Sequence, residues 1–459
     1  MLLNKRFQTF IDQRPVSVMS RGILERLFDP KRLDQLFDDE AENGYTRKLH
    51  LSSLVTLMAD VVLGVKPSVH AAYQAREQPP DGVSITAVYN KLDHIETSVS
   101  AALVHDAFTQ CAPAIDTLES RLPPWLPGFR CRVLDGNHLS ATEHRLEPLR
   151  TIWDAPLPGK ALVLSDPERA LAERVFLTED GHASERSLLD DVLLHVDPKD
   201  IWIADRNFCT RKFLFGIAKR LGYFVIRQHG TLPGELVGTP RRVGQSRTGI
   251  VLEQTLVLTD PETGRRKKLR RITVQLKKPT RDGDRELHIL TNLRKTSANA
   301  IRVSELDSKR WTIETMFQEV TTTLQCEIAT LGYPKAALFA FSLALVAYNA
   351  VSVLKASLRS VHGAERVTNE VSGYYLSLEL RGTNEGMMIA IPQKYWRVFR
   401  TMSVPEFVAV LQEIATHVNL ERYRKHPRGP RKPPPEKERY HNGGHASTFK
   451  LLNANKCSR

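Results

Sequence analysis

Asp135 and Asp205 each directly follow a short segment with the pattern of a strand, and they are the first candidates for chemistry in this sequence. Residues 132–134 lead into Asp135, and residues 201–204 lead into Asp205. If both runs are central strands of an open α/β sheet, both carboxylates lie at its carboxyl edge, where ligands bind. The alternative for either aspartate alone is an ordinary turn after a strand, because Asp is a typical turn residue.

A third carboxylate, Glu314, belongs to a segment with helical periodicity. Its apolar stripe consists of Ile313, Phe317, Val320 and Leu324, and the neighbouring face consists of Asp307, Arg310, Glu314, Gln318 and Thr321. Glu314 is therefore expected at the rim of the core, and a solvated helix face is the alternative. Three such acids suit a two-metal phosphoryl-transfer site, because Mg²⁺ prefers oxygen ligands and paired ions stabilise both the attacking and the leaving oxygen.

Charge gives a second indication of function. The 459 residues include 65 Lys+Arg and 52 Asp+Glu, a net charge of +13, in an otherwise ordinary globular composition with 41% hydrophobic residues. The excess is local: residues 230–300 and 421–459 each carry net +8, and everything else carries net −3. A basic chain is attracted to nucleic acid or to an anionic membrane surface. Together with a carboxylate metal site, it indicates a nucleic-acid enzyme.

The elements that must position these residues divide the chain into five parts. Residues 1–125 are predicted to be a helical domain, and residues 126–229 the first part of a mixed-sheet catalytic core. Residues 230–300 are predicted as a β-rich basic insertion, residues 301–420 as the catalytic helix and the C-terminal helical part of the core, and residues 421–459 as a flexible basic tail. The fold class is α/β.

Three segments bear on partners and location. Ser84 begins a helix over 84–92 that suits either DNA recognition or an ordinary bundle. Residues 336–354 carry no formal charge, and we interpret them as a buried core helix instead of a membrane span. The start lacks the apolar core of a signal peptide, and the five cysteines form no Cys-x-x-Cys pair, so a cytoplasmic protein is expected.

The ordered motifs resemble the DDE transposases of bacterial insertion sequences, specifically the insertion sequence 4 group with its Tyr-x2-Arg-x3-Glu-x6-Lys signature. The matching segments are 133–136, 203–208, 290–293 and 310–314, and the likeness covers nearly the whole chain. This resemblance implies a ribonuclease-H-like core in which Asp135, Asp205 and Glu314 hold two Mg²⁺ ions, with Mn²⁺ as the alternative. It also implies that the β-rich insertion holds the transposon end beside the active site.

The signature is only partly matched. Its Arg corresponds to Arg310, but Asp307 occupies the Tyr position and Thr321 the Lys position. In the family those side chains contact the DNA backbone, so the substitutions put end binding and any hairpin step in question. Lys309 or Lys295 is a substitute cation, and Arg227 resembles a family position near the DNA, with a plain surface arginine as its alternative.

The resulting prediction is a bacterial, nucleoid-associated transposase that catalyses DNA transposition and recombination. It would bind terminal inverted repeats and target DNA, act as a homodimer in the DNA complex, and use metal ions to cleave DNA and transfer the strand. Two rivals stay open: a ribonuclease-H-like nuclease without strand transfer, and a catalytically decayed DNA-binding protein. No membrane partner is expected.

Overall fold

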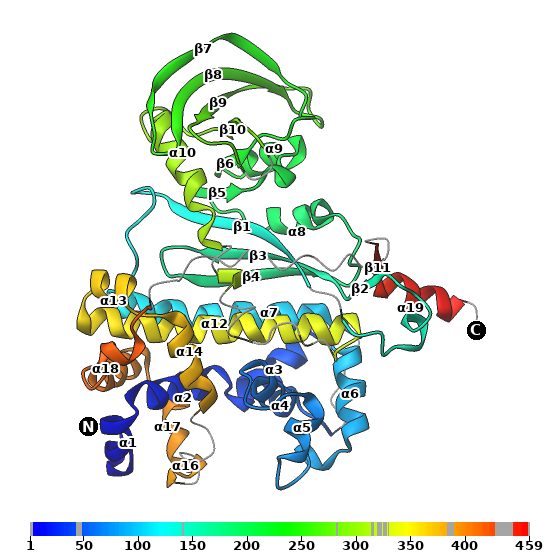
Figure 1. Cartoon of the computed structure of the whole chain (residues 1–459), viewed down its shortest axis with the longest axis vertical. Coiled ribbons are helices and arrows are strands. Elements are labelled where there is room, and N and C mark those ends of the chain that lie inside the picture. The colour runs from blue at the N-terminus through cyan, green and yellow to red at the C-terminus, as the bar shows by residue number, and fades with distance from the viewer. Residues whose placement is uncertain are drawn as a thin grey trace.

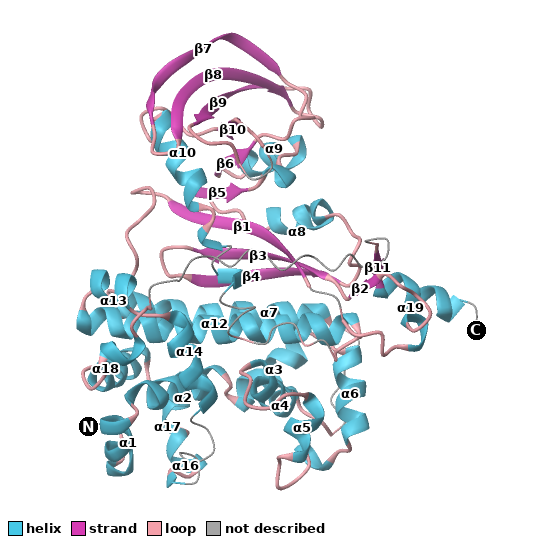
Figure 2. Ribbon diagram, viewed as in Figure 1, coloured by secondary structure: helices cyan, strands magenta, loops and turns pink. Residues whose placement is uncertain are grey.

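The structure is a computed structural model, and it describes residues 3–42, 48–139, 142–280, 283–313, 316–318, 324, 328, 330–382, 390–426 and 444–457. Figure 1 shows a large sheet whose outer strands β7–β10 lie at the top and whose strands β3 and β4 lie nearest a broad helical layer below. The same view coloured by secondary structure separates the strand-rich upper part from the helical lower part (Figure 2). The predicted mixed α/β fold is confirmed at this level.

One nine-stranded sheet runs through the upper and middle parts in the order β4-β3-β1-β5-β6-β10-β9-β8-β7. The strands are β1 Arg130–His138, β3 Lys160–Asp166, β4 Leu171–Thr178, β5 Asp200–Ala204, β6 Tyr223–Arg227, β7 Glu235–Gln245, β8 Gly249–Thr259, β9 Arg266–Leu276 and β10 Glu286–Thr291. β1 is antiparallel to β3 and parallel to β5, and β5 is parallel to β6. The sheet is therefore mixed.

The two-residue period of the strands sends alternate side chains to opposite faces of the sheet. Val133 and Ile203 belong to the larger core cluster, which includes the long helices. Leu134 and Trp202, their neighbours in sequence, belong to a second cluster on the other face, together with residues of α8 (Leu189–Leu193) and α9 (Arg211–Lys219). Both faces of the central strands are thus covered, which explains the mostly apolar sequences of β5 and β6.

Two long helices, α7 (Thr97–Thr117) and α12 (Pro334–His362), lie side by side under the sheet in Figure 1 and pack against β4. Within the described part of the chain, α12 is the one helix long and apolar enough to cross a membrane. However, 94% of its most apolar window is buried inside the protein. It forms the central core helix predicted for residues 336–354.

The helical layer combines both ends of the chain (Figure 1). Its N-terminal members are η1 Lys5–Phe7, α1 Gln8–Gln13, α2 Pro15–Leu27, α3 Pro30–Glu40, α4 Leu51–Val62, α5 Val69–Gln74, η2 Pro80–Gly82 and α6 Ile85–His94. Its C-terminal members are α13 Ala364–Glu370, α14 Gly373–Gly382, α16 Gln393–Trp396, α17 Val398–Thr401, α18 Val404–Ala415 and η6 Leu420–Tyr423. Ser84 caps α6 by accepting a hydrogen bond from the Ala87 amide, as a helix beginning at this serine requires.

The β-rich segment differs from a separate insertion, because it continues the central sheet. β10 pairs antiparallel with β6 through Leu290 and Ile226, and β9, β8 and β7 add outward from β10. α10 (Ala300–Lys309) packs across these strands. A continuous hydrogen-bonded ladder therefore joins this segment to the central strands β6, β5 and β1.

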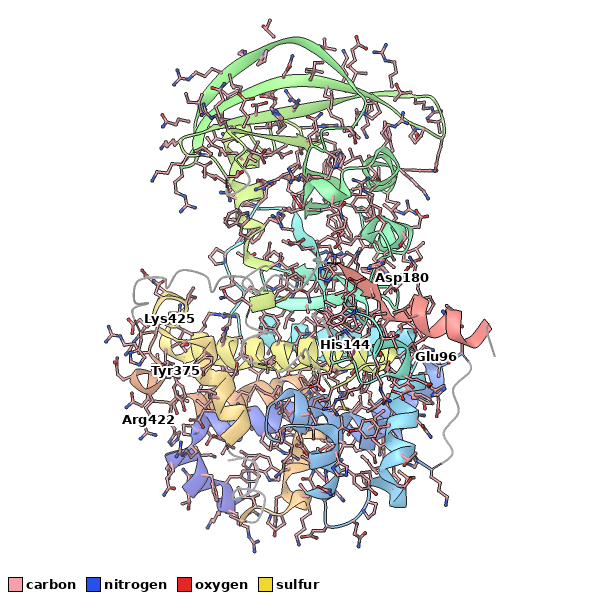
Figure 3. All side chains as sticks on the ribbon, turned by 45° about the vertical axis from the view of Figure 1, so that its right-hand side comes forward. Glu96, His144, Asp180, Tyr375, Arg422 and Lys425 are labelled. Carbon is pink, nitrogen blue, oxygen red and sulfur yellow. The ribbon has the colours of Figure 1, made fainter. Side chains whose placement is uncertain are left out.

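The C-terminal segment also differs from the predicted flexible tail. Residues 444–457 form β11 (His445–Ser447) and α19 (Thr448–Cys457), and β11 pairs in parallel with β2 (Ala155–Leu157). The Ser447 hydroxyl donates to the Asp180 carboxylate at 2.6 Å, and Asp180 is labelled beside this segment in Figure 3. The prediction is therefore corrected for 444–457: backbone pairing and a buried serine hold this part in place, whereas its composition alone indicated disorder.

Candidate active site

Asp135 and Asp205 lie next to each other at the edge predicted from the sequence. The last paired residues of the parallel strands β1 and β5 are Leu134 and Ala204, and each is followed directly by one of the aspartates. Asp135 does not sit in a turn, because β1 continues through Gly136 to His138 along β3. The structure thus brings the two predicted acids together at the carboxyl ends of neighbouring parallel strands, where α/β folds bind ligands.

Arg310 forms a buried ion pair with Asp135. It is the C-cap residue of α10, and its Nη1 donates to Asp135 Oδ2 at 2.6 Å. Both side chains are largely buried, with 6% of Arg310 and 16% of Asp135 exposed. The arginine predicted to contact DNA therefore touches a candidate catalytic acid, which places the end of α10 directly over the site.

Glu314, the third predicted acid, lies outside the described residues, as does Thr321. Ile313 and Leu324 of the predicted apolar stripe are described, and both are buried. The sequence predicts a helix in this part of the chain, and the described residues 312–313 and 316–318 are helical. The assignment of Glu314 as a metal ligand stays a prediction.

Glu185 is an acid at this edge that the sequence did not single out. It begins η4 (Glu185–Leu188), and its side chain is 11% exposed. A Cβ added at Gly136 would lie 2.3 Å from Glu185 Oε1, so this carboxylate packs directly on the β1 backbone beside Asp135. Glycine at 136 is thus explained by the close approach of Glu185.

Glu185 also reaches the segment that follows the second aspartate. Asn207, in η5 (Arg206–Phe208), donates from Nδ2 to Glu185 Oε2 at 2.5 Å. Arg186 donates from Nε to the Asn207 carbonyl at 2.7 Å. Glu185 therefore connects the backbone beside Asp135 with the turn after Asp205, and a glutamate fifty residues after the first acid gave no sequence signal for this contact.

His138 lies at the rim of the same edge, with Nδ1 3.9 Å from Glu185 Oε1. Burial lowers the pKa of its imidazole, Lys160 lowers it further, and Glu185 opposes both effects.

Arg227 and Asp307 form a buried ion pair between β6 and α10. Arg227 donates from Nε and Nη2 to both carboxylate oxygens of Asp307 at 3.0–3.1 Å. Asp307 is 2% exposed and Arg227 17%. The acid that replaces the tyrosine of the family signature therefore has a structural partner, and Arg227 is not a plain surface arginine.

The other candidate DNA-binding cations also have protein contacts. The Lys309 ammonium lies 5.4 Å from the centre of the Trp125 ring, and burial lowers its pKa. Lys295 is mostly exposed and lies 3.5 Å from Glu253. Neither lysine is placed against the acid pair by a described contact.

Strands β7–β10, here called the sheet extension, have loops at the same edge of the sheet as Asp135 and Asp205. Arg206, the residue after Asp205, lies 3.7 Å from Asp284 in the loop between β9 and β10. This loop is joined to the β7–β8 turn, because the Lys277 amide donates to the Thr248 carbonyl. Lys277 and Lys278 thus belong to a loop system that lies beside the candidate site.

The donor set suits a hard divalent cation. Asp135 and Asp205 offer carboxylate oxygens, the ligand type that Mg²⁺ and Mn²⁺ prefer. Among the described residues, no group of three His, Cys, Asp or Glu side chains is close enough to hold a metal ion. The described acids therefore fit as two ligands of a site that needs a further oxygen donor.

One comparison with known proteins concerns the segment that holds these residues. Residues 127–350 match a family model described as the transposase DDE domain, and this segment runs from the start of β1 into α12. The match supports a DDE transposase, an enzyme that acts on DNA. It includes Asp135, Asp205 and Arg310.

Among solved structures, a similar one is a cryo-EM structure of the piggyBac transposase synaptic complex with hairpin DNA. The two chains share 10% identity with a TM-score of 0.37, over 88% of this chain and 85% of that chain. No match was found among curated proteins.

Proposed function

We propose that this protein is the transposase of a bacterial insertion sequence of the insertion sequence 4 group. The observation that carries the proposal is that Asp135 and Asp205 directly follow Leu134 and Ala204, the last paired residues of the adjacent strands β1 and β5, inside the segment that matches the transposase DDE domain. The strand order β4-β3-β1-β5-β6, with three antiparallel strands followed by two parallel ones, supports a ribonuclease-H-like core.

In this proposal, Asp135, Asp205 and Glu314 hold two Mg²⁺ ions, with Mn²⁺ as the alternative. When bound, such ions activate the attacking oxygen and stabilise the leaving oxygen of a phosphodiester. The chain's own residues position the acids: Arg310 fixes the Asp135 carboxylate, and Glu185 ties the turn after Asp205 to β1.

DNA substrates are the terminal inverted repeats and a target duplex. The loops beside the acids carry lysines whose charge favours phosphate contacts, and such contacts position DNA without reading sequence. Two DNA ends must be brought together, so the active form is proposed to be a homodimer in the bacterial cytoplasm, associated with the nucleoid.

The test is an oligonucleotide that carries the element's end, incubated with the protein and Mg²⁺. We expect nicking at the repeat boundary followed by joined products, and we expect Asp205→Ala to abolish both. Cleavage that survives Asp205→Ala refutes the acid assignment. Cleavage without joined products shows a nuclease, and equal binding without cleavage at any metal concentration shows a DNA-binding protein only.

A further inference from the structure

We propose that a basic groove at the far side of the sheet extension binds the phosphodiester backbone of duplex DNA, at a position separate from the acid pair. The proposal rests on the proposed function, which supplies DNA as the partner, and adds a second place of contact. The groove has a volume of about 620 Å³. Its cations are Lys212, Lys219, Arg220, Arg265, Arg266 and Lys267.

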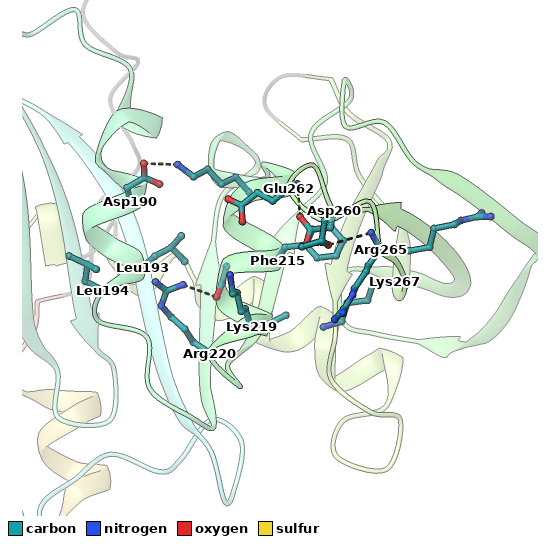
Figure 4. A pocket seen from close by; sticks show the side chains of 15 residues that line it. Asp190, Leu193, Leu194, Phe215, Lys219, Arg220, Asp260, Glu262, Arg265 and Lys267 are labelled. Carbon is teal, nitrogen blue, oxygen red and sulfur yellow. Dashed lines mark hydrogen bonds and ion pairs between the residues drawn. The ribbon is translucent and has the colours of Figure 1, made fainter.

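Two elements far apart in the sequence form the walls of this groove (Figure 4). Lys219 and Arg220 come from the C-terminal end of α9, and Arg265 and Lys267 come from the turn and strand start between β8 and β9. Cations on two facing walls form a positively charged channel. Such a channel suits an extended polyanion, which is held along its length by several phosphates.

The charge of the groove is only partly balanced by protein acids. Lys212 pairs with Asp190 at 2.6 Å, and Arg266 pairs with Glu235. Within the described ranges, Lys219, Arg220, Arg265 and Lys267 form no ion pair with an acid.

The acids Asp190, Asp260 and Glu262 complete the charged lining, so cations exceed acids by three. Lys267 is half-buried, and burial lowers the pKa of its ammonium group. A phosphate bound beside Lys267 would supply a negative charge to pair with this ammonium group.

The strand register separates the groove from the acid pair. Ala204 pairs with Ile226, the next residue of β6 pairs with Ile289, and Ile289 pairs with Ile272 of β9, so Ile272 is level with Asp205. Arg266 lies six residues before Ile272, toward the opposite edge of the sheet. This separation is roughly 20 Å along the strands and about 14 Å across three strand spacings.

The distance from the acid pair to this groove is shorter than one helical turn of a duplex. The combined separation is roughly 25 Å, which corresponds to about seven base pairs at 3.4 Å each. An isolated small anion is a poorer fit, because the groove is open and the cations lie on separate walls. Leu194 is an exposed apolar residue of the groove. It lies beside the basic residues, so it does not keep a phosphate from contacting them.

The experiment measures the salt dependence of duplex binding by fluorescence anisotropy, without divalent metal. The test variant is Lys219→Gln/Arg265→Gln, because both side chains are exposed and carry no described ion pair. The matched control is Lys394→Gln/Arg397→Gln, which removes the same charge from exposed residues of α16 and its C-cap, at the opposite end of the molecule (Figure 1).

For a duplex that extends well beyond the terminal repeat, losing two phosphate contacts should reduce the salt slope by about 1.8. Between 50 and 200 mM salt, the variant's affinity should then fall roughly 12-fold less than that of the unmodified protein. A duplex ending fewer than about seven base pairs from the cleavage position should show no such difference. The control should behave like the unmodified protein on both duplexes.

An unchanged slope for the test variant, with normal binding by the unmodified protein, overturns the groove and leaves the proposed function standing. An equal effect of the control variant also overturns it, because the cause would then be overall charge. Absence of DNA binding by the unmodified protein refutes the proposed function instead. Loss of binding to phosphatidylserine vesicles, with DNA binding unchanged, assigns the groove to a membrane surface and refutes the proposal. If the double variant melts early, Lys219→Gln alone should reduce the slope by about 0.9.

Discussion

Replacing Gly136 by alanine should disturb the candidate active site only by displacing Glu185. A double variant of Gly136 and Glu185 tests whether the effect depends on this contact. The new Cβ would lie 2.3 Å from Glu185 Oε1, well inside ordinary contact distance, so the carboxylate must move. Glu185 is the flexible partner, and moving it breaks its hydrogen bond from Asn207. The turn after Asp205 then loses its link to β1.

The size of the effect follows from the bond that is lost. A hydrogen bond to a charged group contributes about 1.5–3 kcal/mol. If that free energy holds Asp205 in place for the reaction, its loss slows cleavage by roughly 10- to 150-fold. Glu185→Ala removes the same bond and should slow cleavage by a similar factor.

The assay is the cleavage rate of an oligonucleotide carrying the element's end, measured at saturating DNA for Gly136→Ala, Glu185→Ala and the double variant. Because both changes act through one contact, the double variant should be no slower than Glu185→Ala. Additive losses would refute the reasoning, since they would show that alanine at 136 disturbs Asp135 directly. Glu185→Gln, which keeps an acceptor for Asn207, should recover part of the rate.

Two further predictions concern stability. Asp307→Asn leaves the Arg227 guanidinium largely buried without its carboxylate, and the free energy of unfolding in urea should fall by about 3 kcal/mol. Glu305→Gln, which breaks an exposed ion pair with Arg302 on the same helix, should cost under about 1 kcal/mol, and equal losses would contradict a special role for the buried pair. Burial, followed by Arg174 and Arg132, lowers the pKa of His195 to about 4. The unfolded chain protonates this residue near pH 6.5, before the folded chain does, so His195 should destabilise the fold as the pH falls from about 6.5 toward 4. The melting temperature of His195→Gln should therefore decrease less over that range, and an identical pH profile would count against this assignment.

The acid pair could be predicted from sequence because the information is local. A buried strand has a nearly continuous apolar run, and parallel neighbours bring their ends to one edge, so the positions of Asp135 and Asp205 follow from two short segments. The long core helix could also be predicted from the sequence, because residues 336–354 form a long segment without formal charge.

What could not be predicted depends on pairing between distant segments. Glu185 meets Gly136 and Asn207 through loops, and no periodicity connects these positions. In the sequence, Asp307 is only a departure from a family signature. The structure shows that it forms a bidentate contact with Arg227. The pairing of β10 with β6, which makes the basic segment part of the central sheet, likewise has no local signal.

The pairing of β11 with β2 has a consequence for synthesis. β2 emerges from the ribosome long before its partner β11, since residues 158–444 lie between the two strands in the sequence. A nascent or prematurely terminated chain therefore exposes the β2 edge and leaves Asp180 without the Ser447 hydroxyl. Completion of this region therefore depends on residues 445–447, so a chain that stops before them cannot form this strand pair.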